Sequence, residues 1–176
     1  MSWKKVYIPA LLALFITTGH AANGYDRNEI SEEPVSMASE ANSAGSYELL
    51  QLINQSRIKQ GLPPLVQDVK LTALAVEHAE EMAKQGFISH DLPSGNIFVR
   101  MNRAGYNYDT IGENIARSRT ISYAHNALLE SPSHKENILF DGVTHVGIGI
   151  VKGDPATRYG DYFYIVEIFA SLGEAY

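Results

Sequence analysis

The clearest hydrophobic pattern in the chain is a helical stripe between residues 68 and 86. Apolar side chains recur there at intervals of three and four residues, while charged side chains fill the opposite face. We therefore predict an amphipathic helix. His78 falls on its apolar side, where a histidine is more often a buried residue with one hydrogen bond than a ligand. The stripe consists of Leu71, Leu74, Ala75, His78, Ala79, Met82 and Ala83.

Shorter patterns of the same period predict four further helices. In the first of these, Ser46 can cap the start, and Gly61 followed by two prolines ends it. Arg57 lies on this helix, and the pattern leaves two alternatives for it: contact with a buried carbonyl or carboxylate, or a solvated surface position. Phe98 is expected to point inward from the second. The four segments are 46–60, 96–104, 120–130, and a short helix that Pro132 opens and Ser131 caps.

Two late segments alternate with the period of a β-strand. Residues 143–151 place branched apolar side chains on one face and Gly147 and Gly149 on the other, which indicates another surface pressed close on the glycine side. Residues 162–170 are apolar on both faces and are therefore expected to be covered on both. Fewer than ten residues join the two strands, which favours antiparallel neighbours. Helices early and strands late predict an α+β layered domain.

The first 45 residues lack these patterns. Residues 1–22 are typical of a signal peptide, with two lysines, an apolar run and small residues before a cleavage site after Ala21. The alternative of a membrane anchor is weaker because the run is shorter than the roughly 20 residues that span a bilayer. Residues 23–45 are polar and acidic and predict a flexible linker. The folded domain is expected over 46–176, in a secreted or periplasmic protein without a stable membrane anchor after cleavage.

Charge and cysteine content narrow the classes of function. The chain has 14 basic and 20 acidic residues, a formal net charge of −6, and no cysteine. Removing residues 1–22 would remove two lysines and leave a net charge of −8. Such a chain is a poor candidate for nucleic-acid binding, which needs clustered basic residues. Without cysteine, no disulfide framework, thiolate metal site or cysteine nucleophile is available.

Three polar residues far apart in the sequence are the candidate site. His90 opens a loop, His134 lies in the first turn of the short helix, and Glu113 lies between an aromatic connection at 106–111 and a short extended piece at 114–116. Loops and element ends are where functional groups gather. We therefore expect the fold to bring these three side chains into one surface cleft.

A series of short motifs in this order and spacing resembles the CAP (or SCP) domain of cysteine-rich secretory proteins, antigen-5 and pathogenesis-related proteins. The resemblance is to the bacterial, cysteine-free branch and covers nearly all of the chain after the linker. The motifs are Asn54-Gln55-Ser56-Arg57, Gly61-Leu62-Pro63-Pro64-Leu65, His78-Ala79-Glu80-Glu81-Met82, Phe87-Ile88-Ser89-His90, Gly105-Tyr106, Gly112-Glu113-Asn114-Ile115-Ala116, Ser131-Pro132-Ser133-His134, Asn137-Ile138-Leu139 and Val146-Gly147-Ile148-Gly149.

The resemblance implies an α-β-α sandwich around a central antiparallel sheet and a cleft lined by histidines and glutamates. In some members that cleft holds zinc or another divalent cation. Carried to this chain, the metal ligands are His90, Glu113 and His134. A second family glutamate has no clear counterpart: Ser131 stands at its position, and Glu130 is one residue early. His125 and His145 match no cleft position and are expected to be surface or structural residues.

Three functions remain open from the sequence, the third being a cell-envelope or toxin-like interaction protein. The first is a non-enzymatic exported binding module for a small molecule, a lipid-like molecule, a glycan or a protein. The second is a metal-assisted, peptidase-like hydrolase that uses the same cleft. Two imidazoles and a carboxylate are a common zinc ligand set that leaves a coordination position open, and zinc binding would weaken below about pH 6.5. A metal-free pocket in which Glu113 bonds to the histidines is the alternative.

Overall fold

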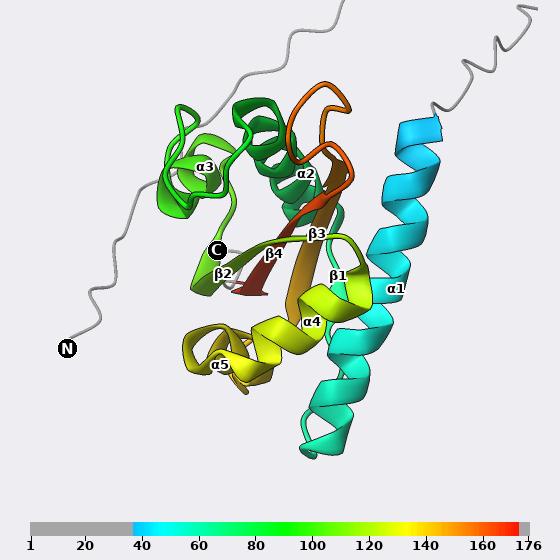
Figure 1. Ribbon diagram of the computed structural model, residues 1–176. Coiled ribbons are helices and arrows are strands. Elements are labelled where there is room, and N and C mark those ends of the chain that lie inside the picture. The colour runs from blue at the N-terminus through cyan, green and yellow to red at the C-terminus, as the bar shows by residue number, and fades with distance from the viewer. Residues whose placement is uncertain (1–36, 173–176) are drawn as a thin grey trace, which may run out of the picture. The chain divides into compact units, whose positions relative to one another are not determined.

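The computed structural model describes residues 37–172, which form five helices and four strands (Figure 1). Side chains are described from residue 43 onward. The predicted signal peptide therefore lies outside the described residues, as does most of the predicted linker. The elements are α1 (Met37–Lys59), β1 (Val66–Gln67), α2 (Val69–Gln85), α3 (Ile97–Arg103), β2 (Tyr108–Ser118), α4 (Ile121–Glu130), α5 (Pro132–Leu139), β3 (His145–Lys152) and β4 (Phe163–Leu172).

The strands form one sheet in the order β1-β3-β4-β2. The three long strands pair antiparallel with one another, β4 with β2 and with β3, as the sequence predicted for β3 and β4. The two-residue strand β1, which the sequence analysis missed, adds a parallel edge beside β3. Helix α2 covers one face of the sheet, and α1, α4 and α5 lie on the other (Figure 1). The predicted α-β-α sandwich is confirmed.

Strand alternation divides the core into two layers. Along β4, Tyr164, Val166 and Ile168 pack toward α2, whereas Ile165 and Phe169 pack toward α1 and α4. Both faces of β4 are therefore buried, as its sequence predicted. Each face gains stability from the apolar surface that it removes from water.

Helix α2 lies almost directly on β3 because two glycines remove the side chains between them. A Cβ added to Gly147 would lie 2.2 Å from the backbone of Leu71, and one added to Gly149 would lie 2.3 Å from that of Ala75. The surface that the sequence predicted against the glycine side is therefore α2. Helix–sheet contact this close brings the loop that follows α2 near the sheet.

We expect Gly149→Ala to destabilise the fold by about 1–3 kcal/mol, because the new methyl group collides with helix backbone that cannot rotate away. Urea denaturation would measure the loss. Gly45→Ala is the matched control: its Cβ would approach only the terminal methyl of Ile121, at 3.0 Å, and the terminal methyl of Ile150, at 3.2 Å, within a helix. The control should be neutral or slightly stabilising, since alanine is a better helix former than glycine. Equal losses in both variants would contradict this account.

Helix α1 begins earlier than predicted. The sequence analysis placed its start at Ser46, whereas the structure continues the helix back to Met37, inside the segment expected as linker. The segment lacks apolar periodicity, but its alanine, methionine and glutamate residues have good intrinsic helix propensity. Periodicity alone therefore placed the start too late.

The helices after α1 start close to their predicted positions. Asp68, Asn96 and Thr120 cap α2, α3 and α4 by accepting backbone N–H bonds through their side chains. Ser131 precedes α5 as predicted but makes no capping bond to it. Phe98 was expected inward and is instead 55% exposed. Ile97 and Met101, four residues apart, form the inward face of this short helix, and Phe98 is left on the outside.

The largest difference concerns β2, which runs over eleven residues. The sequence analysis divided this region into an irregular connection at 106–111 and a short extended piece at 114–116. The prediction of an irregular connection was wrong from residue 108 onward, because the strand from Tyr108 to Ser118 pairs with β4. Gly112, Glu113 and Asn114 interrupt the apolar pattern, so the strand is not visible as an alternation of apolar residues.

Of the two alternatives left open for Arg57, the structure shows contact with buried carbonyl groups. Its guanidinium group is fully buried and donates to the carbonyl oxygens of Pro63, Ile138 and Phe140, each at 2.9 Å. Arg57 therefore ties α1 to the turn that follows it and to the end of α5. These bonds satisfy carbonyl groups that would otherwise be buried without partners.

Candidate functional site

Strand β2 presents the candidate residues on two faces of the sheet. Glu113 and Ile115 alternate with Asn114, and Ile115 packs in the layer covered by α2. Glu113 therefore faces α2 and the loop after it, whereas Asn114 faces α5. β2 is an edge strand, so its neighbours on the open side are loops and helix ends.

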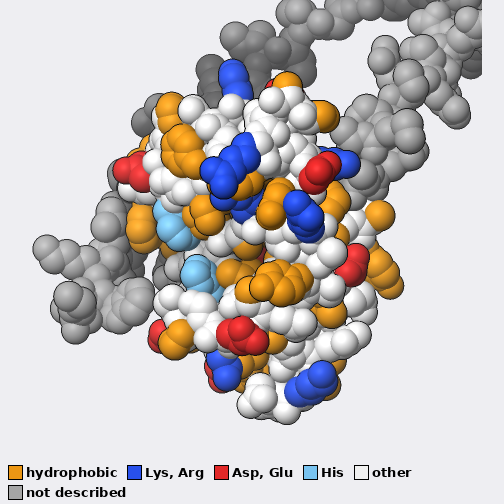
Figure 2. Space-filling model, viewed as in Figure 1, with side chains coloured by type: hydrophobic (Ala, Val, Ile, Leu, Met, Phe, Trp, Pro, Cys, Tyr) orange, Lys and Arg blue, Asp and Glu red, His pale blue; other side chains and the backbone are white. Residues whose placement is uncertain are grey.

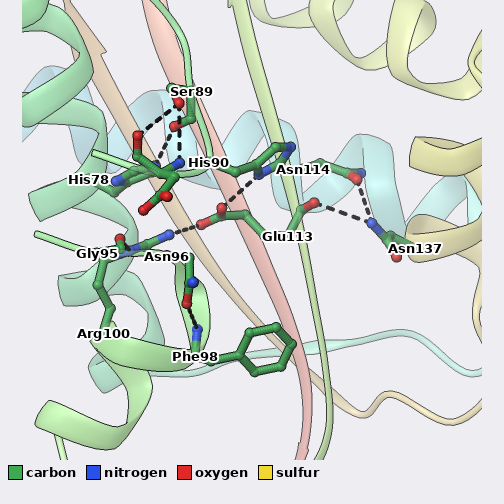
Figure 3. A network of polar contacts seen from close by, with 11 residues as sticks. His78, Ser89, His90, Gly95, Asn96, Phe98, Arg100, Glu113, Asn114 and Asn137 are labelled. Carbon is green, nitrogen blue, oxygen red and sulfur yellow. Dashed lines mark hydrogen bonds and ion pairs between the residues drawn. The ribbon is translucent and has the colours of Figure 1, made fainter. Parts of the chain in front are cut away.

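The Glu113 carboxylate is held by two basic residues (Figure 3). One oxygen lies 2.9 Å from His90 Nδ1, and the other accepts a hydrogen bond from Arg100 Nη2. Only 2% of the Glu113 side chain is exposed, and Arg100 is fully buried. Burial alone would raise the pKa of Glu113, but the bond to His90 and the Arg100 guanidinium outweigh it and hold that pKa below its ordinary value. Glu113 is therefore a buried anion.

The bond to Glu113 orients the imidazole of His90. A charged carboxylate accepts hydrogen bonds, so we assign the proton to Nδ1, which leaves Nε2 with a lone pair in the neutral ring. The His90 side chain is 53% exposed, in contrast to its buried partner. Beneath this loop, His78 Nε2 lies 2.9 Å from the carbonyl oxygen of Ser89. His78 is fully buried, which confirms it as a core histidine.

His134 reaches the same region from α5. Its Nδ1 lies 2.8 Å from Ser131 Oγ, so the serine expected to cap the helix orients this ring instead. Burial, and to a smaller extent the positive charge of a protonated His90, lower the pKa of His134. Figure 2 shows two histidine surfaces, one above the other, between the levels of α3 and α5.

Asn114 ties the two sides of the region together. Its amide nitrogen donates to the His134 carbonyl oxygen at 3.1 Å and to Glu167 Oε2 at 2.9 Å. Its amide oxygen accepts from Asn137 Nδ2 at 2.9 Å (Figure 3). Gly112 makes this approach possible, because a Cβ there would lie 2.9 Å from the Asn137 side-chain oxygen. The glycine, glutamate and asparagine of this motif therefore have separate structural tasks.

The similarity of this chain to known proteins covers the residues of this site. The sequence model of the cysteine-rich secretory protein family, CAP, matches residues 50–169, which is more than half of the chain. This chain belongs to the CAP family. The match spans the described domain from α1 to β4, so the motifs of the sequence analysis and the fold lead to the same family.

Relatives of this CAP domain include protein YkwD of Bacillus subtilis, 34% identical over 137 residues, which cover 72% of this chain and 53% of YkwD. The membrane protein YlbC of the same organism is 30% identical over 105 residues, covering 58% of this chain and 30% of YlbC. The matched part of this chain thus spans about half of the first relative and a third of the second.

Solved structures share the fold. An extracellular SCP-domain protein of Bacillus anthracis superposes with a TM-score of 0.65 at 24% identity, covering 76% of this chain and 42% of that one. An outer surface protein of Borrelia burgdorferi superposes with a TM-score of 0.67 at 23% identity, covering 74% and 94%. At these identities the likeness concerns the fold alone.

The structure brings Glu113 and His90 of this CAP domain into direct contact and ties His134 to the adjacent residue of β2, because Asn114 donates to the His134 carbonyl oxygen. Glu130, which the sequence left as a further candidate, is exposed on α4 and makes no hydrogen bond or ion pair with these residues. Across the described residues, no three His, Asp or Glu side chains are grouped closely enough to hold a metal ion. The three-ligand metal site therefore stays a prediction. We call His90, Arg100, Glu113 and His134 the histidine site.

Sequence reasoning missed several residues that shape the histidine site. Arg100 follows Ile97 by three residues, and Ile97 packs against the core, so the inward position of Arg100 was readable from the helical pattern. Glu167 stands in a strand that was predicted to be covered on both faces, which already implied a buried carboxyl group. Among the other histidines, His125 is buried and lies 2.9 Å from Ser56 Oγ, whereas His145 is partly exposed on β3.

Proposed function

We propose that this CAP protein is an exported, non-enzymatic binding module whose ligand is held at the histidine site. The proposal includes a divalent cation such as Zn²⁺, shared between the Nε2 atoms of His90 and His134 and donor atoms of the ligand. Imidazole is a common ligand for zinc, and two imidazoles alone leave coordination positions for the ligand. The ligand would thus be a small molecule, lipid-like molecule, glycan or protein that carries oxygen or nitrogen donors.

The orientation of the two rings carries this proposal. His90 is bonded through Nδ1 to Glu113, and His134 through Nδ1 to Ser131. Proteins orient metal-binding imidazoles in this way, by a hydrogen bond to the ring nitrogen that does not touch the metal. The lowered pKa of His134 favours its neutral, metal-binding form. In this proposal Glu113 orients a ligand and is not itself one.

Two observations disfavour the hydrolase that the sequence left open. Both oxygens of Glu113 already accept a hydrogen bond, from His90 and Arg100, and the side chain is buried, so it is poorly placed to activate water. The lowered pKa of Glu113 also makes its carboxylate a weak proton acceptor, whereas a general base works best with a pKa near the operating pH. Both observations favour a site that binds a ligand over one that hydrolyses it.

The signal-like segment at residues 1–22 supports export. Two proteins with the same fold also support it, one an extracellular protein and the other an outer surface protein. Within residues 37–172, no helix is long and apolar enough to cross a membrane. We propose that the protein acts in the periplasm or outside the cell.

Zinc titration by isothermal calorimetry tests the site. We expect the purified chain to bind Zn²⁺, and His134→Ala to weaken binding by at least about tenfold, because half of the protein's ligands are lost. Glu113→Gln should weaken binding by roughly ten- to a hundredfold through misorientation of His90. His145→Ala is the matched control, since it removes a partly exposed histidine outside the histidine site. Affinity should fall below about pH 6.5.

The outcomes separate the alternatives. Absence of zinc binding, or an equal loss in His145→Ala, would contradict the shared-cation site. Circular dichroism of each variant distinguishes lost binding from lost folding. A panel of peptide and ester substrates should show no turnover. Zinc-dependent turnover that disappears in His134→Ala would favour the hydrolase over the binding module.

A further inference from the structure

A second polar surface lies at the C-terminal end of β2, beyond Glu113, where arginines and tyrosines are interleaved. Arg117 is near the end of the strand and Arg119 directly follows it, whereas Arg158, Tyr159 and Tyr162 belong to the connection between β3 and β4. We call these five residues the arginine–tyrosine patch. None of them belongs to the histidine site. In Figure 2, Lys and Arg surface gathers mainly in the upper half of the face, among orange apolar and tyrosine surface.

Ring contacts hold the patch in a defined arrangement. The Arg117 guanidinium lies 3.4 Å from the centre of the Tyr159 ring, and its Nη1 donates to the Gly86 carbonyl oxygen. Tyr159 and Tyr162 meet edge to face, with ring centres 5.6 Å apart. Arg117 thus fixes the two tyrosines against the end of α2, by cation–π contact and one hydrogen bond.

The outer two arginines retain their hydrogen-bonding capacity. Arg119 lies 5.1 Å from the Tyr162 ring centre, and Arg158 lies 5.4 Å from that of Tyr159. Both side chains are exposed, and no described residue accepts a hydrogen bond from either. A guanidinium stacked on a ring keeps its N–H groups free in the plane, where they match the two oxygens of a carboxylate, sulfate or phosphate.

The charge of the patch is opposite to that of the whole chain. Lys152 at the end of β3 adds a fourth basic residue, and the β3–β4 connection carries only two acidic residues, Asp154 and Asp161. Asp154 is already engaged, because its Oδ1 accepts from the Ala156 backbone N–H at 2.8 Å. On a chain with a net charge of −6, a polyanion meets local attraction here and general repulsion elsewhere.

From this geometry we propose that the arginine–tyrosine patch binds an acidic glycan, a polysaccharide that carries carboxylate, sulfate or phosphate groups. Arg119 and Arg158 bind its anionic groups. Tyr159 and Tyr162 are partly exposed, and their hydroxyl groups make no hydrogen bond to described residues, so these hydroxyls are available to sugar hydroxyls. An acidic peptide could pair its carboxylates with the arginines, but it has no sugar hydroxyls for the tyrosine hydroxyl groups to bind.

Binding of a labelled heparin oligosaccharide to the purified chain tests the proposal. Fluorescence anisotropy at low ionic strength, with EDTA present, excludes any contribution from a cation at the histidine site. We expect measurable binding that weakens steadily with added salt. The double variant Arg119→Ala/Arg158→Ala should weaken it by about tenfold or more, through loss of two charge-assisted contacts. Lys59→Ala/Lys70→Ala is the matched control, since it removes the same charge from exposed positions elsewhere.

Two comparisons make the test specific. Tyr162→Phe keeps the ring under Arg119 and removes only the hydroxyl, so it should weaken heparin binding without changing thermal stability. Polyglutamate of similar charge should bind more weakly than heparin, and neutral dextran should not bind. The proposal is overturned if heparin does not bind, if the lysine control loses as much as the arginine variant, or if polyglutamate binds equally well.

Discussion

Arg100→Met is expected to destabilise the protein by about 3–5 kcal/mol, because it leaves the buried Glu113 carboxylate without its cationic partner. Methionine occupies a similar volume, so the loss reports charge and hydrogen bonding more than packing. Arg100 also donates to the Gly95 carbonyl oxygen at 3.1 Å, and this bond would be lost as well. The loop that carries His90 would lose its anchor on α3. Urea denaturation at neutral pH measures the effect.

The pH dependence of that loss identifies its cause. Without Arg100, the carboxyl group of Glu113 can be neutral once the pH falls below its new, higher pKa. The deficit of Arg100→Met relative to the unchanged protein should therefore shrink toward pH 4. The double variant Arg100→Met/Glu113→Gln should be more stable at neutral pH than Arg100→Met alone, since neither charge is then buried. A deficit that is constant with pH and persists in the double variant would mean that packing is the cause.

Glu167→Gln is expected to stabilise the protein at alkaline pH and to change the shape of its pH–stability curve. Glu167 is completely buried, and burial raises its pKa from 4.5 to about 7, against the smaller effect of the hydrogen bond from Asn114. The unfolded chain would ionise near the ordinary value, so the folded state binds the proton more tightly. The stability that the neutral carboxyl group contributes is therefore fully present below pH 4.5 and is lost as pH rises through 7. The loss is on the order of 3 kcal/mol.

Comparison of the two proteins across that range isolates Glu167. Glutamine keeps the side-chain length and still accepts the Asn114 N–H, but it cannot ionise. The difference in unfolding free energy should grow in favour of Glu167→Gln between pH 5 and pH 8. Titrations of other groups are common to both proteins and cancel in that difference. If the difference stays constant with pH, Glu167 does not change its protonation in the folded state over this range.

The sequence was sufficient for the parts of the fold that follow from periodicity. The stripe on α2 and the glycine side of β3 predicted their contact, and the structure shows the helix backbone against those glycines. The start of α1 and the length of β2 could not be read this way. The first depends on helix propensity without an apolar face, and the second contains polar residues that serve the histidine site.

Three of the four residues of the histidine site were candidates from the sequence, but Arg100 and the contacts among the four were not. Motif positions identified His90, Glu113 and His134, yet neither spacing nor residue type shows which atoms meet. The occupation of both Glu113 oxygens depends on Arg100, whose position requires α3 to pack beside β2. Only the assembled fold shows that Glu113 is a buried anion engaged on both sides.

Strand β2 has a consequence for how sequences of this family can vary in length. Glu113 and Arg117 point to one side of the sheet because they are four positions apart in the strand, an even offset. Inserting or deleting one residue between them would reverse one of the two side chains. Natural variation in chain length should therefore be concentrated in the connection at 153–162, where extra residues leave the pairing of the strands unchanged, and should be absent between Gly112 and Ser118.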